Sequence, residues 1–175
     1  MRGKKMRAFL KWTSYVLFAL VLFCFQSAPE RLGLFSDVIF LLPFVIAFAC
    51  YEEMIPSVIM ASVCGLFFDY SVQRIFGYNA LVLCILCFFV SFAMKYFIRP
   101  VFLGVVVSIF AASFVYCIVD FFFFFVLKGY EEVGTLILSN YLPLFLKTGI
   151  FGILIAFVVK KIYDLSPLRA KFDNN

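Results

Sequence analysis

Long runs without a charged residue are the feature that most limits how this chain can fold. Residues 12–29 form a run of 18 uncharged residues, and 101–119 form another of 19 before a carboxylate follows. A helix needs about 20 mostly apolar residues to cross the roughly 30 Å hydrocarbon core of a bilayer. With 66% hydrophobic residues and 27 Phe among 175 residues, the chain has more apolar surface than a soluble domain of this size buries. The sequence therefore predicts an all-α integral membrane protein.

Apolar runs separated by polar turns predict a bundle of six transmembrane helices. The second run is short and contains Pro43, so it can span only if residues 32–36 also enter the membrane. The first run could be a signal peptide, but Gln26 stands where a cleavage site has a small residue, and we interpret the run as an uncleaved span. We expect the spans at 12–29, 38–50, 56–68, 77–94, 101–127 and 141–159. The transmembrane domain is then 12–162, between a basic N-terminus at 1–11 and a tail at 163–175.

The distribution of Lys and Arg predicts which side of the membrane holds the chain ends. Six spans put both termini on one side, and that side carries 11 Lys and Arg residues. The opposite side carries 3, which are Arg31, Arg74 and Lys128. Since basic residues accumulate on the cytoplasmic side, we expect both termini in the cytoplasm. Cleavage of the first span would leave the tail on the same side.

Several functional classes lack their usual residues. The sequence has no His, and its six Cys lie in apolar runs, so we expect no metal site and no cofactor. Cys84 and Cys87 form a CxxC pattern among Leu, Ile and Phe, which indicates buried apolar positions. No nucleophile motif or close carboxylate pair indicates an enzyme. The basic residues lie mainly at the chain ends and in short turns, which is typical of membrane topology and not of nucleic-acid binding.

Small residues recur every four positions in the third and fifth predicted spans, and each series ends in a carboxylate. Such stripes let helix backbones approach closely in lipid, where dispersion packing drives association. We expect them to serve packing within the bundle or contact with a partner, including a second copy of this chain; chance recurrence is the alternative. The two stripes are Ser57, Ala61, Gly65 and Asp69, and Gly104, Ser108, Ala112, Tyr116 and Asp120.

Asp69 stands at the C-terminal end of the third predicted span, where the helix dipole disfavours an anion. A carboxylate in lipid needs a partner or a route to water. The fourth span begins about ten residues later on the same face of the membrane, and its free amides near Tyr78 and Asn79 are suitable donors. Gly77 permits a close turn. We therefore expect Asp69 to close the turn between these spans, the alternative being a carboxylate among the lipid headgroups.

Lys147 lies inside the sixth predicted span and calls for a counter-ion. At 1.5 Å per residue, Lys147 is roughly 20 Å from the cytoplasmic side, Asp69 roughly 24 Å and Asp120 roughly 32 Å. We expect an intramembrane ion pair between Lys147 and Asp69, with Asp120 as the second choice. In the alternative, the lysine stem extends to the outer headgroups.

The residues around Asp69 resemble the rod shape-determining protein MreD family. That family has an Asp opening the second span, G-L-x-x-D ending the third and G-x-x-A-L opening the fourth. The matching residues here are Asp37, Gly65, Leu66, Asp69, Gly77, Ala80 and Leu81, with Asn79 inside the last motif. Chain length, six spans and a basic N-terminus also agree, although the specific motifs lie within residues 37–81. The sequence departs at Ser36, where the family often has Pro, and this affects the expected geometry of that helix start.

The resemblance implies a non-enzymatic scaffold of the bacterial cell-elongation machinery in the cytoplasmic membrane. Members of the family associate with the bitopic protein MreC and, through it, with the MreB filament system, the RodA glycan polymerase and a penicillin-binding transpeptidase. The family also resembles in fold the S components of energy-coupling factor transporters. A vitamin-binding subunit is therefore the alternative function, although this chain offers few polar side chains for such a pocket.

Overall fold

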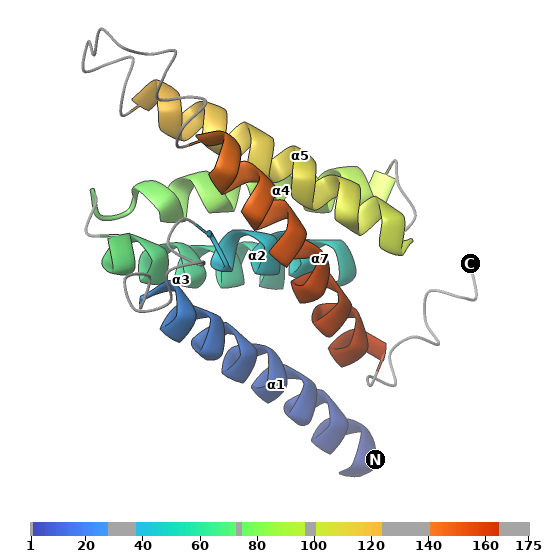
Figure 1. Ribbon diagram of the computed structural model, residues 1–175. Helices are drawn as coiled ribbons and strands as arrows, with labels where there is room; N and C mark the ends of the chain where they lie inside the picture. The colour runs from blue at the N-terminus through green and yellow to red at the C-terminus, as the bar shows by residue number, and fades with distance from the viewer. Residues whose placement is uncertain (1, 28–37, 73–74, 97–100, 124–140, 165–175) are drawn as a thin grey trace, which may run out of the picture.

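The protein is described by a computed structural model over residues 2–27, 38–72, 75–96, 101–123 and 141–164 (Figure 1). Within these residues the only regular elements are six helices, and there are no strands. The helices are α1 (Arg2–Gln26), α2 (Leu41–Tyr51), α3 (Met54–Val72), α4 (Tyr78–Tyr96), α5 (Phe102–Phe121) and α7 (Leu142–Asp164).

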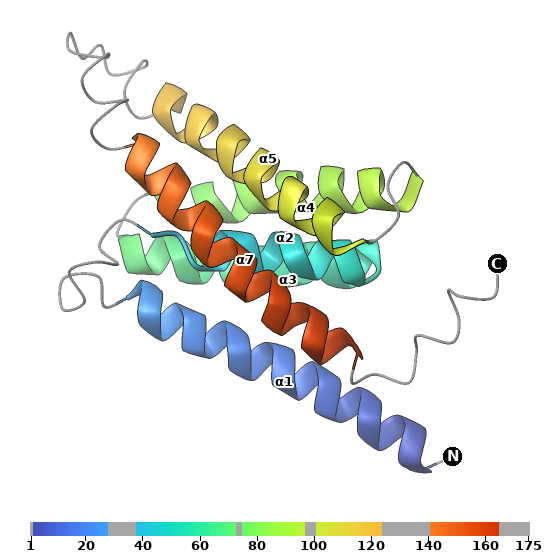
Figure 2. The ribbon, with the colours of Figure 1, turned by 45° about the vertical axis from the view of Figure 1, so that its right-hand side comes forward.

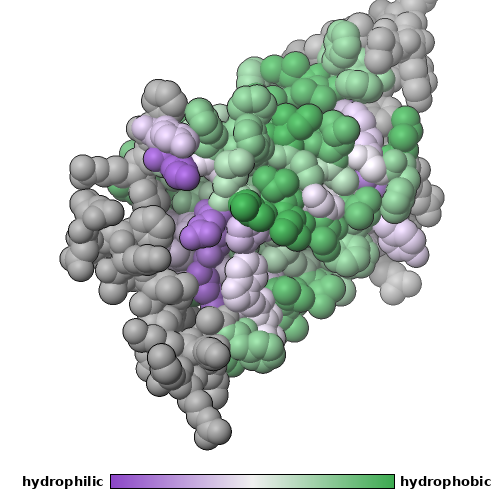
Figure 3. Space-filling view, turned by 180° about the vertical axis from the view of Figure 1, so that it is seen from behind, coloured by the Kyte–Doolittle hydropathy of each residue, from purple (hydrophilic) through white to green (hydrophobic). Residues whose placement is uncertain are grey.

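Five of these helices, all except α2, contain an apolar stretch long enough to cross a membrane. The stretches are 18 to 23 residues long. At 1.5 Å per residue they measure about 27–35 Å, which matches the hydrocarbon core of a bilayer. In the view from behind, apolar residues make up most of the coloured surface, and hydrophilic residues gather left of its centre, beside the grey atoms, with a smaller group on the right (Figure 3). The prediction of an all-helical, multi-pass membrane protein is thereby confirmed.

In place of the second predicted span, the structure has a short helix that is enclosed by the rest of the protein. Helix α2 has 11 residues, and this length corresponds to about 16 Å, roughly half of the hydrocarbon core. Every residue from Leu41 to Cys50 is buried within the protein, so α2 has no lipid-facing side. A helix that is apolar all round can be enclosed by other helices as readily as by lipid. Residues 32–36, which a full second span would need, lie outside the described residues.

Helix α2 is the central element, and the five longer helices pack around it. In Figures 1 and 2, α1 and α5 lie on opposite sides of the bundle, with α2 between them. The most extensive contact joins α3 and α4, whereas α4 and α5 touch over a much smaller area. The start of α1 and the end of α7 lie at the same end of the bundle, because Lys11 Nζ is 5.3 Å from the centroid of the Tyr163 ring.

Both ends of α2 are hydrogen-bonded by side chains from other helices. The N–H of Ile39 donates to Thr148 Oγ1 at 3.2 Å, and the N–H of Phe40 donates to Gln26 Oε1 at 2.8 Å. At the other end, the Ser91 hydroxyl donates to the carbonyl of Ala49 at 3.3 Å. Unsatisfied backbone groups cost several kcal/mol each where no water reaches them. These three bonds explain how so short a helix can end inside the protein.

A charged cluster joins α1, α7 and the turn after α2. Lys11 forms an ion pair with Glu52, and both side chains are largely buried. The Tyr15 hydroxyl donates to Glu52 Oε1 at 3.2 Å, while Tyr51 stacks on Tyr163 with ring centroids 5.1 Å apart. Burial raises the pKa of Tyr51 to about 12, so its phenol stays neutral beside the pair. In the sequence, Lys11 belongs to the basic N-terminus at 1–11 and Glu52 to the polar residues between the second and third predicted spans, and the two are 41 residues apart.

Candidate functional site

Asp69, near the end of α3, binds the backbone at the start of α4. Its Oδ1 accepts the N–H of Asn79 at 2.9 Å, and its Oδ2 accepts the N–H of Gly77 at 2.9 Å and, at a longer 3.4 Å, that of Ala80. The Asp69 side chain is 1% exposed. These are amides that the first turn of a helix leaves free, and the positive end of the helix dipole favours a carboxylate there. Asp69 therefore caps α4 and closes the α3–α4 turn, as expected from the sequence.

Gly77 provides the backbone conformation that this cap requires. Its φ is +92°, in the region where a residue with a Cβ is strained. The N–H of Leu81 donates to the Gly77 carbonyl at 3.0 Å, so Gly77 begins the hydrogen-bonding of α4. Because Gly77 has no side chain to act as the cap, the carboxylate comes from Asp69, eight residues earlier.

Gly65 lets α3 and α4 approach each other one helical turn before Asp69. A Cβ on residue 65 would lie 2.3 Å from Ala80 Cα and 2.7 Å from Ala80 N. Both are backbone atoms that cannot move without displacing α4. Gly65, Asp69, Gly77, Asn79 and Ala80 therefore form one compact joint between the two helices.

Asn79 connects this joint to α5. Its side chain is fully buried, and its Oδ1 accepts the hydroxyl hydrogen of Tyr116 at 2.7 Å. The Tyr116 ring also packs against Phe68 of α3, with centroids 6.2 Å apart. The sequence motif included Asn79 without giving it a partner. In the sequence, Tyr116 could have been recognised as a residue of the site because it is the one aromatic residue in the α5 stripe.

The small-residue stripe of α3 faces the interior of the bundle. Ser57, Ala61 and Gly65 are all buried, like Asp69, and these positions fit helix packing within the chain. On α5, Ala112 is buried as well.

Gly104 and Ser108, at the start of the α5 stripe, are half-buried. The Ser108 hydroxyl points to Met94 Sδ of α4 at 3.9 Å. These two residues remain the candidates for contact with a partner.

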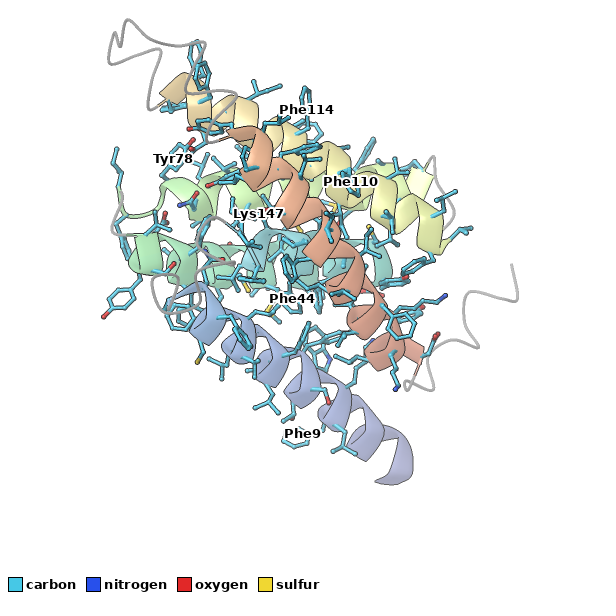
Figure 4. The ribbon with its side chains drawn as sticks, in the orientation of Figure 1. Phe9, Phe44, Tyr78, Phe110, Phe114 and Lys147 are labelled. Carbon is cyan, nitrogen blue, oxygen red and sulfur yellow. The ribbon has the colours of Figure 1, made fainter. Side chains whose placement is uncertain are left out.

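The expected counter-ion of Lys147 stays a prediction. The oxygens of Asp69 accept backbone amides from the start of α4, and Lys147 is not among the partners of this carboxylate in the described part of the chain. Asp120, the second choice, is buried and accepts the hydroxyl hydrogen of Tyr141 at 2.8 Å. Lys147 lies in the first half of α7 (Figure 4). Its neighbour in the sequence, Thr148, accepts the N–H of Ile39 just before α2.

No group of His, Cys, Asp and Glu that could hold a metal ion occurs among the described residues. The six Cys are free thiols, and Cys84 Sγ lies 2.9 Å from the Ser62 hydroxyl. Asp37, which belongs to the sequence motif, and Arg74 lie outside the described residues.

The site is thus a structural joint in which the charged group is held by main-chain donors. A comparison of the chain with models of protein families, with curated proteins and with solved structures found no match.

Proposed function

We propose that this chain is a non-enzymatic membrane scaffold of the MreD type, acting in the cell-elongation complex of a bacterium. The observation that carries the proposal is the joint between α3 and α4. The motif residues shared with the MreD pattern, Gly65, Asp69, Gly77 and Ala80, contact one another there. These residues pack two helices together and cap one of them. Such structural roles fit a scaffold, which acts by holding its helices in a fixed arrangement.

The proposed location is the bacterial cytoplasmic membrane, with both chain ends in the cytoplasm. The contact of Lys11 with the Tyr163 ring supports the placement of both ends on one side. The side that holds both chain ends carries 11 Lys and Arg residues and the opposite side carries 3, which supports the placement of both chain ends in the cytoplasm. In this orientation the α3–α4 joint lies toward the outer face.

The proposed partners are an MreC-like bitopic protein and, through it, the MreB system, a RodA-like polymerase and a penicillin-binding transpeptidase. Since Ser57 and Ala61 are used inside the bundle, a partner helix would meet a lipid-facing surface instead. Within the α5 stripe, Gly104 and Ser108 are the half-buried small residues, and small residues let a partner backbone approach closely. A second copy of the chain is a further candidate for the same face.

Copurification tests this proposal. The tagged chain is expressed with an MreC-like protein from the same organism, and the wild type is expected to retain that partner after extraction in mild detergent. Gly104→Leu and Ser108→Leu should reduce the retained partner several-fold while the variants stay folded. Ile59→Leu, on an exposed part of α3, is the matched control. Failure of the wild type to retain an MreC-like protein would refute the scaffold function, and equal retention by all variants would refute the α5 face.

The alternative function is that of a vitamin-binding subunit, similar to the S components. One observation favours it, namely that two buried polar atoms, Asn79 Nδ2 and Ser113 Oγ, have no hydrogen-bond partner within the part of the chain that the structure describes. A rise in melting temperature on addition of one vitamin from a screened set would support this alternative. The same screen without any shift supports the scaffold.

A further inference from the structure

Three lysine side chains near the ends of membrane-crossing helices form no ion pair in the described part of the chain. They are Lys95, in the last turn of α4, and Lys160 and Lys161, near the end of α7. Basic groups at the ends of spanning helices lie close to the lipid headgroups, where anionic lipids attract them. The charges of these lysines are therefore not neutralised by the described protein, and they lie where an anionic ligand is at hand.

The start of α5 lies between the ends of α4 and α7 that carry these lysines (Figures 1 and 2). On the α4 side, Met94 Sδ lies 3.9 Å from the Ser108 hydroxyl oxygen. On the α7 side, Lys160 Nζ lies 5.3 Å from the centroid of the Phe102 ring. Phe102 and Ser108 are six residues apart on α5 and point about 120° away from each other around its axis. The lysines of α4 and α7 therefore flank α5 at one end of the bundle.

Aromatic rings hold two of the three ammonium groups. Lys160 is half-buried against Phe102, and Lys95 Nζ lies 5.7 Å from the centroid of the Tyr96 ring. The face of a ring attracts an ammonium group but does not neutralise its charge. An ammonium group has three N–H donors, and a ring covers only one side of it. Both groups are therefore held in place with donors left for an anion, whereas Lys161 is exposed and has no ring contact among the described residues.

The depth of these lysines matches that of lipid phosphate groups. The membrane-crossing stretch of α4 ends at Tyr96, that of α5 begins at Phe102 and that of α7 ends at Asp164. The ends of such stretches lie where the hydrocarbon core meets the headgroups. Lys160 precedes the end of its stretch by four residues, or about 6 Å along the helix, and a lysine stem can extend over that distance. A phosphate in the headgroup layer is therefore within reach of Lys160.

We propose that this end of α4, α5 and α7 binds the headgroup of an anionic phospholipid, with Lys160 on Phe102 as the main contact and Lys95 on Tyr96 as the second. The last five residues of α4 and of α7 and the first five of α5 carry the three lysines and one carboxylate, Asp164, so their net charge is +2 (three minus one). A zwitterionic headgroup carries a cation of its own, which these lysines repel. The proposal is independent of the scaffold function, because it requires only a bilayer that contains anionic lipid.

Native mass spectrometry of bound lipid tests the proposal. The full chain is reconstituted with phosphatidylglycerol and phosphatidylcholine in equal amounts and extracted in mild detergent, and the lipids that stay bound are counted. The wild type should retain phosphatidylglycerol in preference. Lys160→Met should lower the retained phosphatidylglycerol about five-fold, and Lys95→Met should lower it less. Lys161→Met is the matched control, since it removes the same charge from the next residue, which is exposed, and it should retain as much as the wild type.

Two further variants separate the position of the charge from its presence. Phe102→Leu keeps every charge but removes the ring that holds Lys160, so it should also lower the retained phosphatidylglycerol. Lys160→Arg keeps both the charge and the ability to lie on the ring, so it should retain the lipid. The melting temperature of each variant in phosphatidylcholine nanodiscs shows that it is folded.

Three results would overturn the proposal. The first is a wild type that retains the two lipids equally. The second is equal retention by Lys160→Met and Lys161→Met, because total charge and not the ring-held ammonium group would then decide binding. The third concerns the source of the phosphate: if free glycerol phosphate raised the melting temperature in phosphatidylcholine nanodiscs as much as phosphatidylglycerol does, the ligand would be a soluble phosphate and not a lipid.

Discussion

Gly65 and Ala80 lie so close that a Cβ on residue 65 would be 2.3 Å from the Cα of Ala80. The substitution Gly65→Ala therefore forces α3 and α4 apart. We expect a net loss of about 1–3 kcal/mol in the free energy of unfolding, although alanine by itself favours a helix. Gly149→Ala is the comparison. The three atoms nearest to its Cβ would all belong to the ring of Phe110, which can rotate, so a smaller loss is expected. Unfolding of both variants in detergent checks this, and equal losses would contradict the backbone contact.

Asp69→Asn should weaken the cap of α4. The amide keeps one oxygen as an acceptor but turns an NH₂ group toward a backbone N–H, and it removes the charge that the helix dipole stabilises. We expect a loss of about 2 kcal/mol in the free energy of unfolding.

Glu53→Gln makes the same chemical change at an exposed position and should have little effect. If Asp69→Asn matched this control in folded yield, detergent stability and function, Asp69 would not be the cap.

The effects of substituting Lys11 and Glu52 on the free energy of unfolding should depend strongly on each other. Removal of either partner leaves the other buried and charged, so Lys11→Met or Glu52→Gln alone should cost about 3 kcal/mol. The double variant should cost clearly less than the sum of the two, because it leaves no charge behind. A double-mutant cycle of unfolding free energies measures this, with Lys161→Met as the exposed control. Additive losses would mean that the ion pair contributes nothing.

The counter-ion of Lys147 can be identified in the same way. Lys147→Ala should destabilise the protein, and that loss should shrink when the true partner is also changed to Asn. The two combinations to compare are with Asp69→Asn and with Asp120→Asn. Losses that add in both would assign Lys147 to the headgroup region.

Reporter fusions test the orientation. A fusion after Asn175 should report the cytoplasm, and one within residues 128–140 should report the outer side of the membrane. Inverted signals would exclude cytoplasmic termini.

Sequence alone determined the features that depend on neighbours along the chain. The long apolar runs predicted α3, α4 and α7 to within a few residues of their observed bounds, because a span is a property of consecutive residues. The cap was also predictable, since Asp69 and Asn79 are ten residues apart and joined by a turn. Even there, the spacing predicted only that amides at the start of α4 would be the donors. The structure shows which N–H group donates to which carboxylate oxygen.

Only the tertiary structure decided which residues from distant parts of the chain meet. The Thr148 hydroxyl accepts the N–H of Ile39 across 109 residues, and the Tyr116 hydroxyl donates to Asn79 Oδ1 across 37. The burial of α2 depends on the same packing. The sequence of a short apolar helix has the same pattern whether lipid or five other helices surround it, so it does not indicate which of them does. Each of these contacts follows from how the helices pack side by side, and a pattern along one helix gives the direction of its faces but not the neighbour that covers each face.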